Sequence, residues 1–361
     1  MLSEFAAEQW MTRYETLAKV NMTETSCDAL RLEELEALEP GLFSELVLDY
    51  GPITGSDELK RQILAMYETG GPENITTAAG CVNASQHVMD ELIEPEDSVM
   101  VFTPGYQQFA GYAASLGAQV TELPLDPANW QADLDALEEA AEHRGLDLLI
   151  LNLPGNPTGT ILTEEQLQRV IRIAETHDAW ILCDEVYCGI GTVMPSVSDR
   201  YEKGIATGSL SKALACPGIR IGWVKGPGAL IDRLNIRRDY TFIGAGPLND
   251  RMAAAVLRHR EAVLARNNAI VKQNTAALRA WLQDNPSYSC VIPEAGSVAL
   301  LRLPEGVDDE DFALQLMEEA GLFFVPGRFF GAPGTLRLGL GRPPEVFMKG
   351  LTLLAGFAWG S

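Results

Sequence analysis

Short apolar runs alternate with longer amphipathic stretches through the middle of the chain. Residues 99–102, 148–151 and 180–183 are apolar runs of strand length, and each is followed directly by a polar residue. The stretches between the runs have the spacing of amphipathic helices, and residues 163–166 form a capping box that opens one of them. Strands that are separated by helices indicate a mostly parallel sheet.

The rest of the chain extends this pattern. The run at 220–224 follows residue 212 without room for a crossover helix, so we expect it to be an antiparallel strand. Helices are predicted at residues 1–20, after Asp28, after Ser56, at 229–239 and, as one long helix, at 247–283. Residues 284–361 alternate strand-like runs with a helix near 309–320. The predicted fold is α/β, with three layers, a mostly parallel, mixed central sheet and a smaller α+β domain.

Four segments follow from this division. They are an N-terminal arm with part of the small domain (1–45), a large domain (46–245), a linking helix (246–283) and a C-terminal small domain (284–361).

Composition narrows the classes of function. The net charge of −23 argues against nucleic acid and anionic membranes as partners. No apolar run reaches membrane-spanning length and no basic leader opens the chain, so we expect a cytoplasmic protein. The six cysteines form no CxxC pair and the four histidines are scattered, which favours neither a disulfide framework nor a metal site.

Three polar residues stand just beyond the ends of predicted strands. Asn156, Asp184 and Lys212 follow the runs at 148–151, 180–183 and 204–207. Because ligands of parallel α/β sheets bind beyond the carboxyl ends of the strands, these side chains should meet at one edge. Lys212 is one of only seven lysines, and an amine, unlike a guanidinium, can become neutral and form a Schiff base. A solvated loop lysine is the alternative.

The motifs around these residues resemble those of a known family. They are Asn-Pro-Thr-Gly at 156–159, Asp-Glu-Val-Tyr at 184–187, Ser-Leu-Ser-Lys at 209–212 and Arg-Ile-Gly-Trp at 220–223. In this order and spacing the chain is similar to fold type I enzymes of the class I/II aminotransferase family, which use pyridoxal 5′-phosphate (PLP). The resemblance makes 46–245 the PLP-binding domain.

The resemblance also implies a set of cofactor contacts. Lys212 would hold PLP as an internal aldimine and move the substrate α-proton, and Asp184 would keep the pyridinium nitrogen protonated. Asn156 and Tyr187 would contact the ring oxygen, and Tyr106 would stack on the ring. The phosphate would be held by Gly80, Cys81, Val82, Ser209, Ser211, Arg220 and Tyr50. Cys81 departs from the family, which usually has a small or hydroxyl residue there.

Substrate and partner contacts are implied in the same way. Arg337 matches the arginine that grips the substrate α-carboxylate, with Asn156 beside it, and a bidentate fork suits that group. Glu24 is a candidate contact for a cationic substrate group, with a solvated loop glutamate as the alternative. In the family the tyrosine at Tyr50 crosses a dimer interface, so the resemblance implies a homodimer with shared active sites.

The expected activity is ping-pong transfer of an amino group between an α-amino acid and a 2-oxo acid. The alternative is a PLP-dependent β- or γ-lyase, or an amino-acid cyclase like capreomycidine synthase, which residues 21–35 and 50–52 resemble. No residue in the sequence decides between these reactions. A PLP sensor fused to a DNA-binding module would need a basic helix-turn-helix segment, and a nicotinamide dehydrogenase would need a glycine fingerprint. Neither is found in the sequence.

Overall fold

The computed structural model describes residues 2–357 and is built around a seven-stranded sheet. The strands, in their order across the sheet, are β2 (Ile75–Ala78), β8 (Gly222–Lys225), β7 (Gly204–Ser209), β6 (Trp180–Asp184), β5 (Leu148–Asn152), β3 (Ser98–Thr103) and β4 (Gln119–Pro124). β8 pairs antiparallel with both neighbours, and the pairs from β7 across to β4 are parallel. The predicted mixed, mostly parallel sheet is confirmed, including its antiparallel strand.

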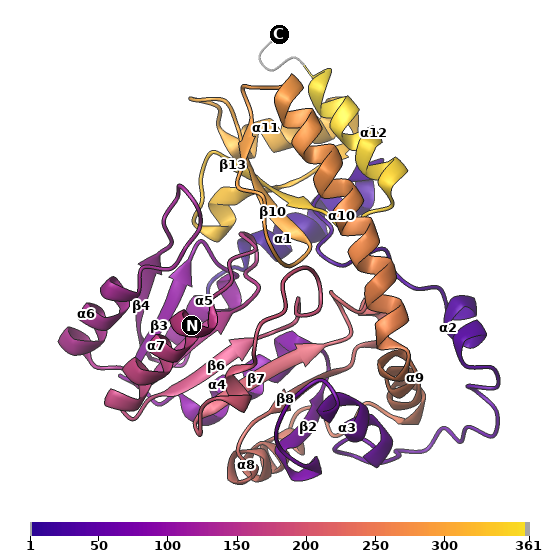
Figure 1. Cartoon of the computed structure of the whole chain (residues 1–361), viewed down its shortest axis with the longest axis vertical. Helices are drawn as coiled ribbons and strands as arrows, with labels where there is room; N and C mark the ends of the chain where they lie inside the picture. Colours follow the sequence, from indigo (N-terminus) through magenta and orange to yellow (C-terminus); the bar gives the residue numbers. More distant parts are fainter. Residues whose placement is uncertain (1, 358–361) are drawn as a thin grey trace.

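Helices cover both faces of this sheet and make three layers (Figure 1). On one face lie α4 (Cys81–Leu92), α5 (Gln107–Ser115) and α8 (Gly228–Arg238). On the other lie α6 (Leu134–Arg144) and α7 (Glu164–Thr176), with α3 (Asp57–Leu64) and α9 (Pro247–Arg258) packed beside β2 and β8. The central strands are buried on both sides, which explains why their sequences are continuously apolar.

A smaller α+β unit stands above the large sheet in Figure 1. Its antiparallel sheet has the order β12 (Val325–Pro326), β13 (Thr335–Gly339), β10 (Val298–Arg302) and β9 (Ser289–Cys290), and beside it β1 (Val20–Asn21) pairs with β11 (Leu322–Phe323). Four helices surround this core: α1 (Ala6–Tyr14), α10 (Arg260–Asp284), α11 (Asp309–Gln315) and α12 (Pro344–Ala355). The two ends of the chain therefore share one hydrophobic core, which joins Trp10 to Phe324 and Leu351.

Short helical turns complete the chain. They are the 3₁₀ turns η1 (Glu15–Leu17), η2 (Pro72–Asn74), η3 (Val197–Asp199), η4 (Pro217–Ile219) and η6 (Gly327–Phe330), and a π turn, η5 (Leu316–Ala320).

Two helix predictions were wrong in detail. The single helix at 247–283 is two helices, α9 and α10, with His259 between them in a non-helical conformation (φ −100°, ψ 16°). The chain turns there because α9 packs beside the large sheet and α10 reaches the small one. The helix predicted directly after Asp28 begins only after Arg31, as α2 (Leu32–Leu38), and Asp28 instead forms an ion pair with Arg266 at 3.1 Å.

The carboxyl ends of three neighbouring strands stop at the same level of the large sheet. Asn152 at the end of β5 pairs in register with Asp184 at the end of β6, and Asp184 pairs with Thr207 of β7. The sheet therefore brings the three predicted motifs to one edge, below β10 and β13. Within residues 2–357, none of the helices combines the length and apolar character that crossing a membrane requires.

Candidate active site

A cavity of about 740 Å³ opens at this edge of the large sheet. Among the residues that line it are Glu24, Cys81, Val82, Tyr106, Asn156, Asp184, Tyr187, Ser209, Ser211, Lys212, Arg220 and Arg337. Gly80 lies immediately before this lining, at the start of α4. The predicted site residues thus gather in one place, with one exception. Tyr50 is not part of the cavity wall, and 74% of its surface is exposed.

Lys212 presents its amine to the cavity in a largely desolvated position. Its Nζ donates a hydrogen bond of 2.5 Å to Thr25 Oγ1. Burial lowers the pKa of Lys212, and the positive charge of Arg337 acts in the same direction, although Glu24, Glu8 and Asp184 oppose the shift. The neutral amine that a nucleophile or base needs is therefore more accessible here than in water.

Asp184 lies at the end of β6 with only 7% of its surface exposed. Its Oδ1 accepts hydrogen bonds from the backbone N–H of Val186 at 2.9 Å and from the Sγ of Cys81 at 3.3 Å. Burial raises the pKa of Asp184 to about 6, despite these hydrogen bonds and the charge of Lys212. A cationic group bound beside it would favour the carboxylate form.

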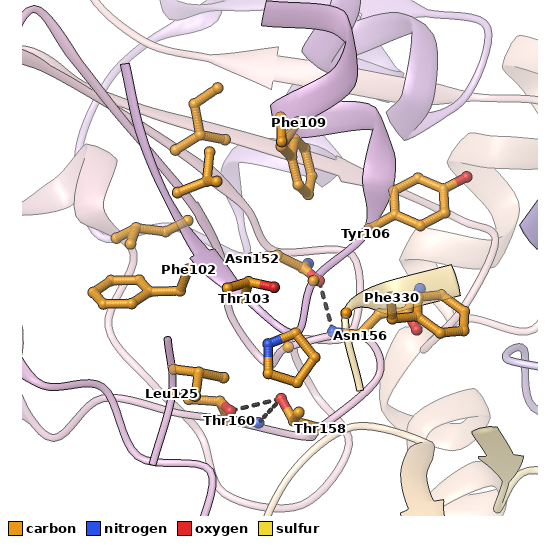
Figure 2. A pocket seen from close by; sticks show the side chains of 18 of the residues that line it. Phe102, Thr103, Tyr106, Phe109, Leu125, Asn152, Asn156, Thr158, Thr160 and Phe330 are labelled. Atoms are coloured by element: carbon orange, nitrogen blue, oxygen red, sulfur yellow. Dashed lines mark hydrogen bonds between the residues drawn. The ribbon is translucent and has the colours of Figure 1, made fainter. Parts of the chain in front are cut away.

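Asn156 and Tyr187 are buried polar groups on the same wall. The backbone N–H of Asn156 donates to Asn152 Oδ1 at 2.7 Å, but its side-chain Oδ1 has no hydrogen-bond partner. Figure 2 shows Asn156 beside Tyr106 and Phe330, where a second, mostly apolar cavity of about 170 Å³ adjoins the first. Burial raises the pKa of the Tyr187 phenol, so that its O–H remains a donor.

An anion cradle forms where α4 begins. Gly80 adopts a φ of +87° at the N-cap, and the amides that follow it, at Cys81 and Val82, belong to the helix turn that lacks internal carbonyl partners. Arg220, in a left-handed conformation, donates from Nη2 to Ala79 O at 3.3 Å and from Nη1 to Pro217 O at 3.0 Å. The φ of +87° favours glycine at position 80, because L side chains rarely adopt it, and a Cβ there would also displace the Arg220 guanidinium, whose Nη2 would lie 2.6 Å away.

Arg337 enters the cavity from β13 and is 2% exposed. Its Nε donates to Thr23 Oγ1 at 3.0 Å, its Nη2 contacts Met11 Sδ at 3.5 Å, and its guanidinium lies 5.0 Å from the centroid of the Phe330 ring. None of these contacts is a carboxylate. The buried guanidinium therefore has no carboxylate in direct contact, although the charges of Glu8 and Glu24 act on it across the cavity.

The family model for aminotransferase class I and II matches residues 21–351 of the chain. The chain belongs to the class I and II aminotransferase family. Capreomycidine synthase of Streptomyces vinaceus is 28% identical over 358 residues, which cover 96% of this chain and 92% of the relative. Among solved structures, a PLP-dependent aminotransferase from Streptococcus suis is 35% identical, with a TM-score of 0.94 over 98% of this chain and 97% of that one. The PLP-dependent cyclase OrfR is 25% identical, with a TM-score of 0.90 over the same shares.

The cofactor of this aminotransferase family member is PLP, and the cavity fits it. The anion cradle suits a phosphate, and the unpartnered Oδ1 of Asn156 suits a ring hydroxyl. Lys212 presents a buried amine, which is the kind of group that the PLP aldehyde requires. The enzyme therefore holds donors for each polar end of the cofactor.

Sequence reasoning missed the contribution of the first helix. Glu8 and Met11 of α1, with Phe5 before it and Glu15 after it, line the cavity. The Tyr106 hydroxyl donates to Glu8 Oε1 at 2.8 Å, and its ring lies 5.0 Å from that of Phe5. The spacing could have indicated that these residues act together, because residues 8, 11 and 15 have the i, i+3, i+7 spacing of one helix face.

Proposed function

We propose that the enzyme transfers an amino group between an α-amino acid and a 2-oxo acid, in the cavity at the edge of the large sheet. The observation that carries the proposal is the convergence of Lys212, Asp184 and Arg337 on one cavity. These residues supply a base, a counter-ion for a bound cation and an anchor for a carboxylate. When bound, PLP supplies an electron sink for the pair left as the substrate Cα–H bond breaks.

Lys212 has two tasks in this proposal. Its Nζ binds the cofactor in the resting enzyme and is released when the substrate amine takes its place. The freed amine, favoured in its neutral form by burial, then accepts the proton from Cα and returns it later in the half-reaction. The hydrogen bond to Thr25 Oγ1 orients the amine.

Asp184 and its neighbours tune and hold the cofactor. The carboxylate of Asp184 would keep the pyridine nitrogen protonated, Asn156 and Tyr187 would bind the ring oxygen, and Tyr106 would pack against the ring. The phosphate would be held by the amides at Cys81 and Val82, together with Ser209, Ser211 and Arg220. The N–H of Gly80 is already engaged, since it donates to Ala78 O at 2.9 Å. Arg337 binds the substrate α-carboxylate, since a buried guanidinium without an anion favours that group strongly.

A second copy of the chain completes the site in this proposal. Val47, Leu48 and Tyr50 are exposed apolar side chains on the segment after α2, and Tyr240 and Ile243 are exposed after α8. Exposed apolar side chains that cluster along loops favour an interface. The partner subunit's Tyr50 would then bind the phosphate beside Arg220, which is exposed in the single chain.

A lyase or cyclase activity is the second candidate. It is supported by the likeness to capreomycidine synthase over 96% of the chain and to the cyclase OrfR. Such enzymes share the base, the counter-ion and the carboxylate anchor, and differ in which bond to the substrate breaks after the α-proton has left.

A single-turnover experiment separates the two candidates. The purified PLP-loaded enzyme is mixed with a panel of L-amino acids, and its spectrum and products are followed. Transfer predicts conversion of the cofactor to pyridoxamine phosphate and release of a 2-oxo acid. Recovery of the starting spectrum with ammonia, thiol or a cyclised amino acid would reject transfer in favour of the second candidate.

A further inference from the structure

Three carboxylates of the N-terminal segment line the same cavity as Lys212 and Arg337. Glu8 comes from α1, Glu15 from η1 and Glu24 from the loop that follows β1. Within residues 2–357, each accepts side-chain or backbone hydrogen bonds only from uncharged donors. Tyr106 donates to Glu8 at 2.8 Å, Asn21 to Glu15 at 2.9 Å, and the backbone and hydroxyl of Ser26 to Glu24 at 2.9 and 2.8 Å.

The segment that carries these carboxylates is fixed to both parts of the molecule. The backbone N–H of Ala6 donates to Gln107 Oε1 at 3.0 Å, at the start of α5, and Trp10 Nε1 donates to Phe324 O at 2.9 Å. Near Glu24 the chain passes so close to β13 that a Cβ on Gly339 would collide with its carbonyl oxygen. The three carboxylates are therefore part of a built wall and are not carried on a loose arm.

The charges of the cavity leave these three groups unbalanced. Under the proposed function Lys212 is joined to the cofactor, Arg220 faces the phosphate and Arg337 faces the α-carboxylate. Asp184 is matched by the ring nitrogen. Arg337 and Lys212 offset part of the charge of these carboxylates before a ligand binds. Once both cations are engaged by the ligand and the cofactor, Glu8, Glu15 and Glu24 are left without a cation of their own. Carboxylates that have no cation beside them favour the binding of a ligand that carries a positive charge.

The buried Arg337 is a second indication of the ligand, and it concerns the opposite end of the ligand molecule. Arg337 is 2% exposed, lines the cavity and has no carboxylate among its contacts, so it requires an anion from the ligand. Glu8, Glu15 and Glu24 all interact electrostatically with Arg337, which places the two kinds of group within one binding space. The apolar side chains of Phe5 and Met11 lie on the same wall and suit a methylene chain.

We propose that the substrate is an α-amino acid whose side chain ends in a guanidinium or ammonium group, bound by Glu8, Glu15 and Glu24. The α-carboxylate meets Arg337, and the methylene chain passes Phe5 and Met11. This inference rests on the proposed function for the position of the α-carboxylate. It also excludes acidic amino acids as good substrates, because their side chain would face three carboxylates. Arg220 and Arg337 are the arginines among the residues lining the cavity, and both have other tasks.

The binding of L-arginine and L-citrulline tests the charge directly. The two amino acids have nearly the same size, and only arginine carries a cation. Their dissociation constants for the PLP-loaded enzyme are measured from the concentration dependence of the first spectral change after rapid mixing, before turnover, with L-glutamate as a third probe. We expect arginine to bind at least about tenfold more tightly than citrulline and glutamate to bind weakest, as one desolvated charge pair is worth at least a tenfold change. Equal affinities for arginine and citrulline, or a preference for glutamate, would overturn the inference.

Isosteric variants identify the carboxylates that act. Glu8→Gln, Glu15→Gln and Glu24→Gln keep the acceptor oxygen of each hydrogen bond and remove the charge. Each should weaken arginine binding and leave citrulline binding within about twofold, so that the arginine-to-citrulline ratio falls. Glu142→Gln, on the exposed side of α6, is the control and should leave the ratio unchanged.

The test of the substrate class can be read separately from the test of the reaction type. Affinity is read whether the bound amino acid is then transaminated, cyclised or cleaved, so a lyase or cyclase result would leave the arginine-to-citrulline ratio intact. A ratio that is the same in the wild type and in all three glutamine variants would contradict the carboxylate wall even in an active aminotransferase.

Discussion

Burial acts on the two titratable groups at the base of the cavity in the same sense, toward their neutral forms. It lowers the pKa of Lys212 and raises that of Asp184 to about 6. For Lys212 this favours the free amine, which is the reactive form. For Asp184, burial destabilises the carboxylate, and a bound cation would remove this destabilisation. At the scale of single residues, the cavity is therefore suited to a cationic ring beside Asp184.

The role of Asp184 predicts the behaviour of Asp184→Asn. Asparagine keeps the oxygen that accepts from Val186 and Cys81 but cannot hold a proton on the ring nitrogen. We expect PLP to remain bound and the loss of the α-proton to slow by about 100-fold or more. Single-turnover rates with a reactive amino acid measure this. Asp135→Asn, on the exposed side of α6, is the control, and an unchanged rate in Asp184→Asn would contradict the assignment.

The same substitution predicts a pH-dependent change in stability. Because the folded-state pKa of Asp184 is raised from 3.8 to about 6, the PLP-free wild type keeps its full stability below pH 3.8. Part of this stability is lost as the pH rises through about 6, where the buried carboxyl group of the folded protein ionises. The asparagine variant lacks this loss. We expect it to be more stable than the wild type by about 2–3 kcal/mol at pH 8, with the difference shrinking toward pH 4.

Urea unfolding of the two PLP-free proteins across this pH range measures the free energy of unfolding. A difference that stayed constant with pH would mean that Asp184 is not the group responsible.

At the scale of elements, the anion cradle depends on how closely two strands approach the start of α4. Gly222 opens β8 between Ala78 of β2 and Ser209 of β7. A Cβ at this position would lie 2.4 Å from the Gly80 carbonyl carbon and 2.8 Å from the Cys81 nitrogen. Both atoms belong to the backbone, so the turn before α4 would have to move.

Gly222→Ala should therefore damage the cradle. We expect a loss of about 1–3 kcal/mol in the free energy of unfolding and at least about a tenfold weaker affinity for PLP. Equilibrium dialysis of PLP and urea unfolding give the two numbers. Gly218→Ala is the matched control, because its Cβ would meet nothing within 4 Å. Equal PLP affinities for the two variants would show that the approach of β8 does not shape the phosphate site.

At the scale of the whole molecule, the sequence predicted the sheet and the edge at which the site lies. The reason is local, since Asn156, Asp184 and Lys212 each lie at or within a few residues of the end of an apolar strand, and parallel strands align their ends. The wall formed by Glu8 and Glu15 could not be predicted in this way. Tyr106, which binds Glu8, is 98 positions away, and only tertiary packing brings the two together. The turn at His259 was missed for the same reason, because no proline or glycine marks it.

The exposed apolar side chains around Tyr50 predict a dimer. If a second copy covers the exposed segment at Tyr50, sedimentation should give twice the 39.3 kDa mass of the chain. Tyr50→Phe should then weaken PLP affinity by several-fold without lowering the stability of the monomer, because the lost hydroxyl contacts the partner's phosphate. A monomer that retains full activity would contradict the shared site.

The claim on which the account depends is that Lys212 is the amine that binds PLP. The most direct measurement is to reduce the PLP-loaded enzyme with borohydride, digest it and locate the pyridoxyl group by mass spectrometry. The chain offers seven lysines, and one of them, Lys225, is already paired with Asp199 at 2.8 Å. We predict stoichiometric label on the peptide that contains Lys212 and none on the other six. Label on another lysine, or no label on an enzyme that binds PLP, would contradict the assignment of the active site.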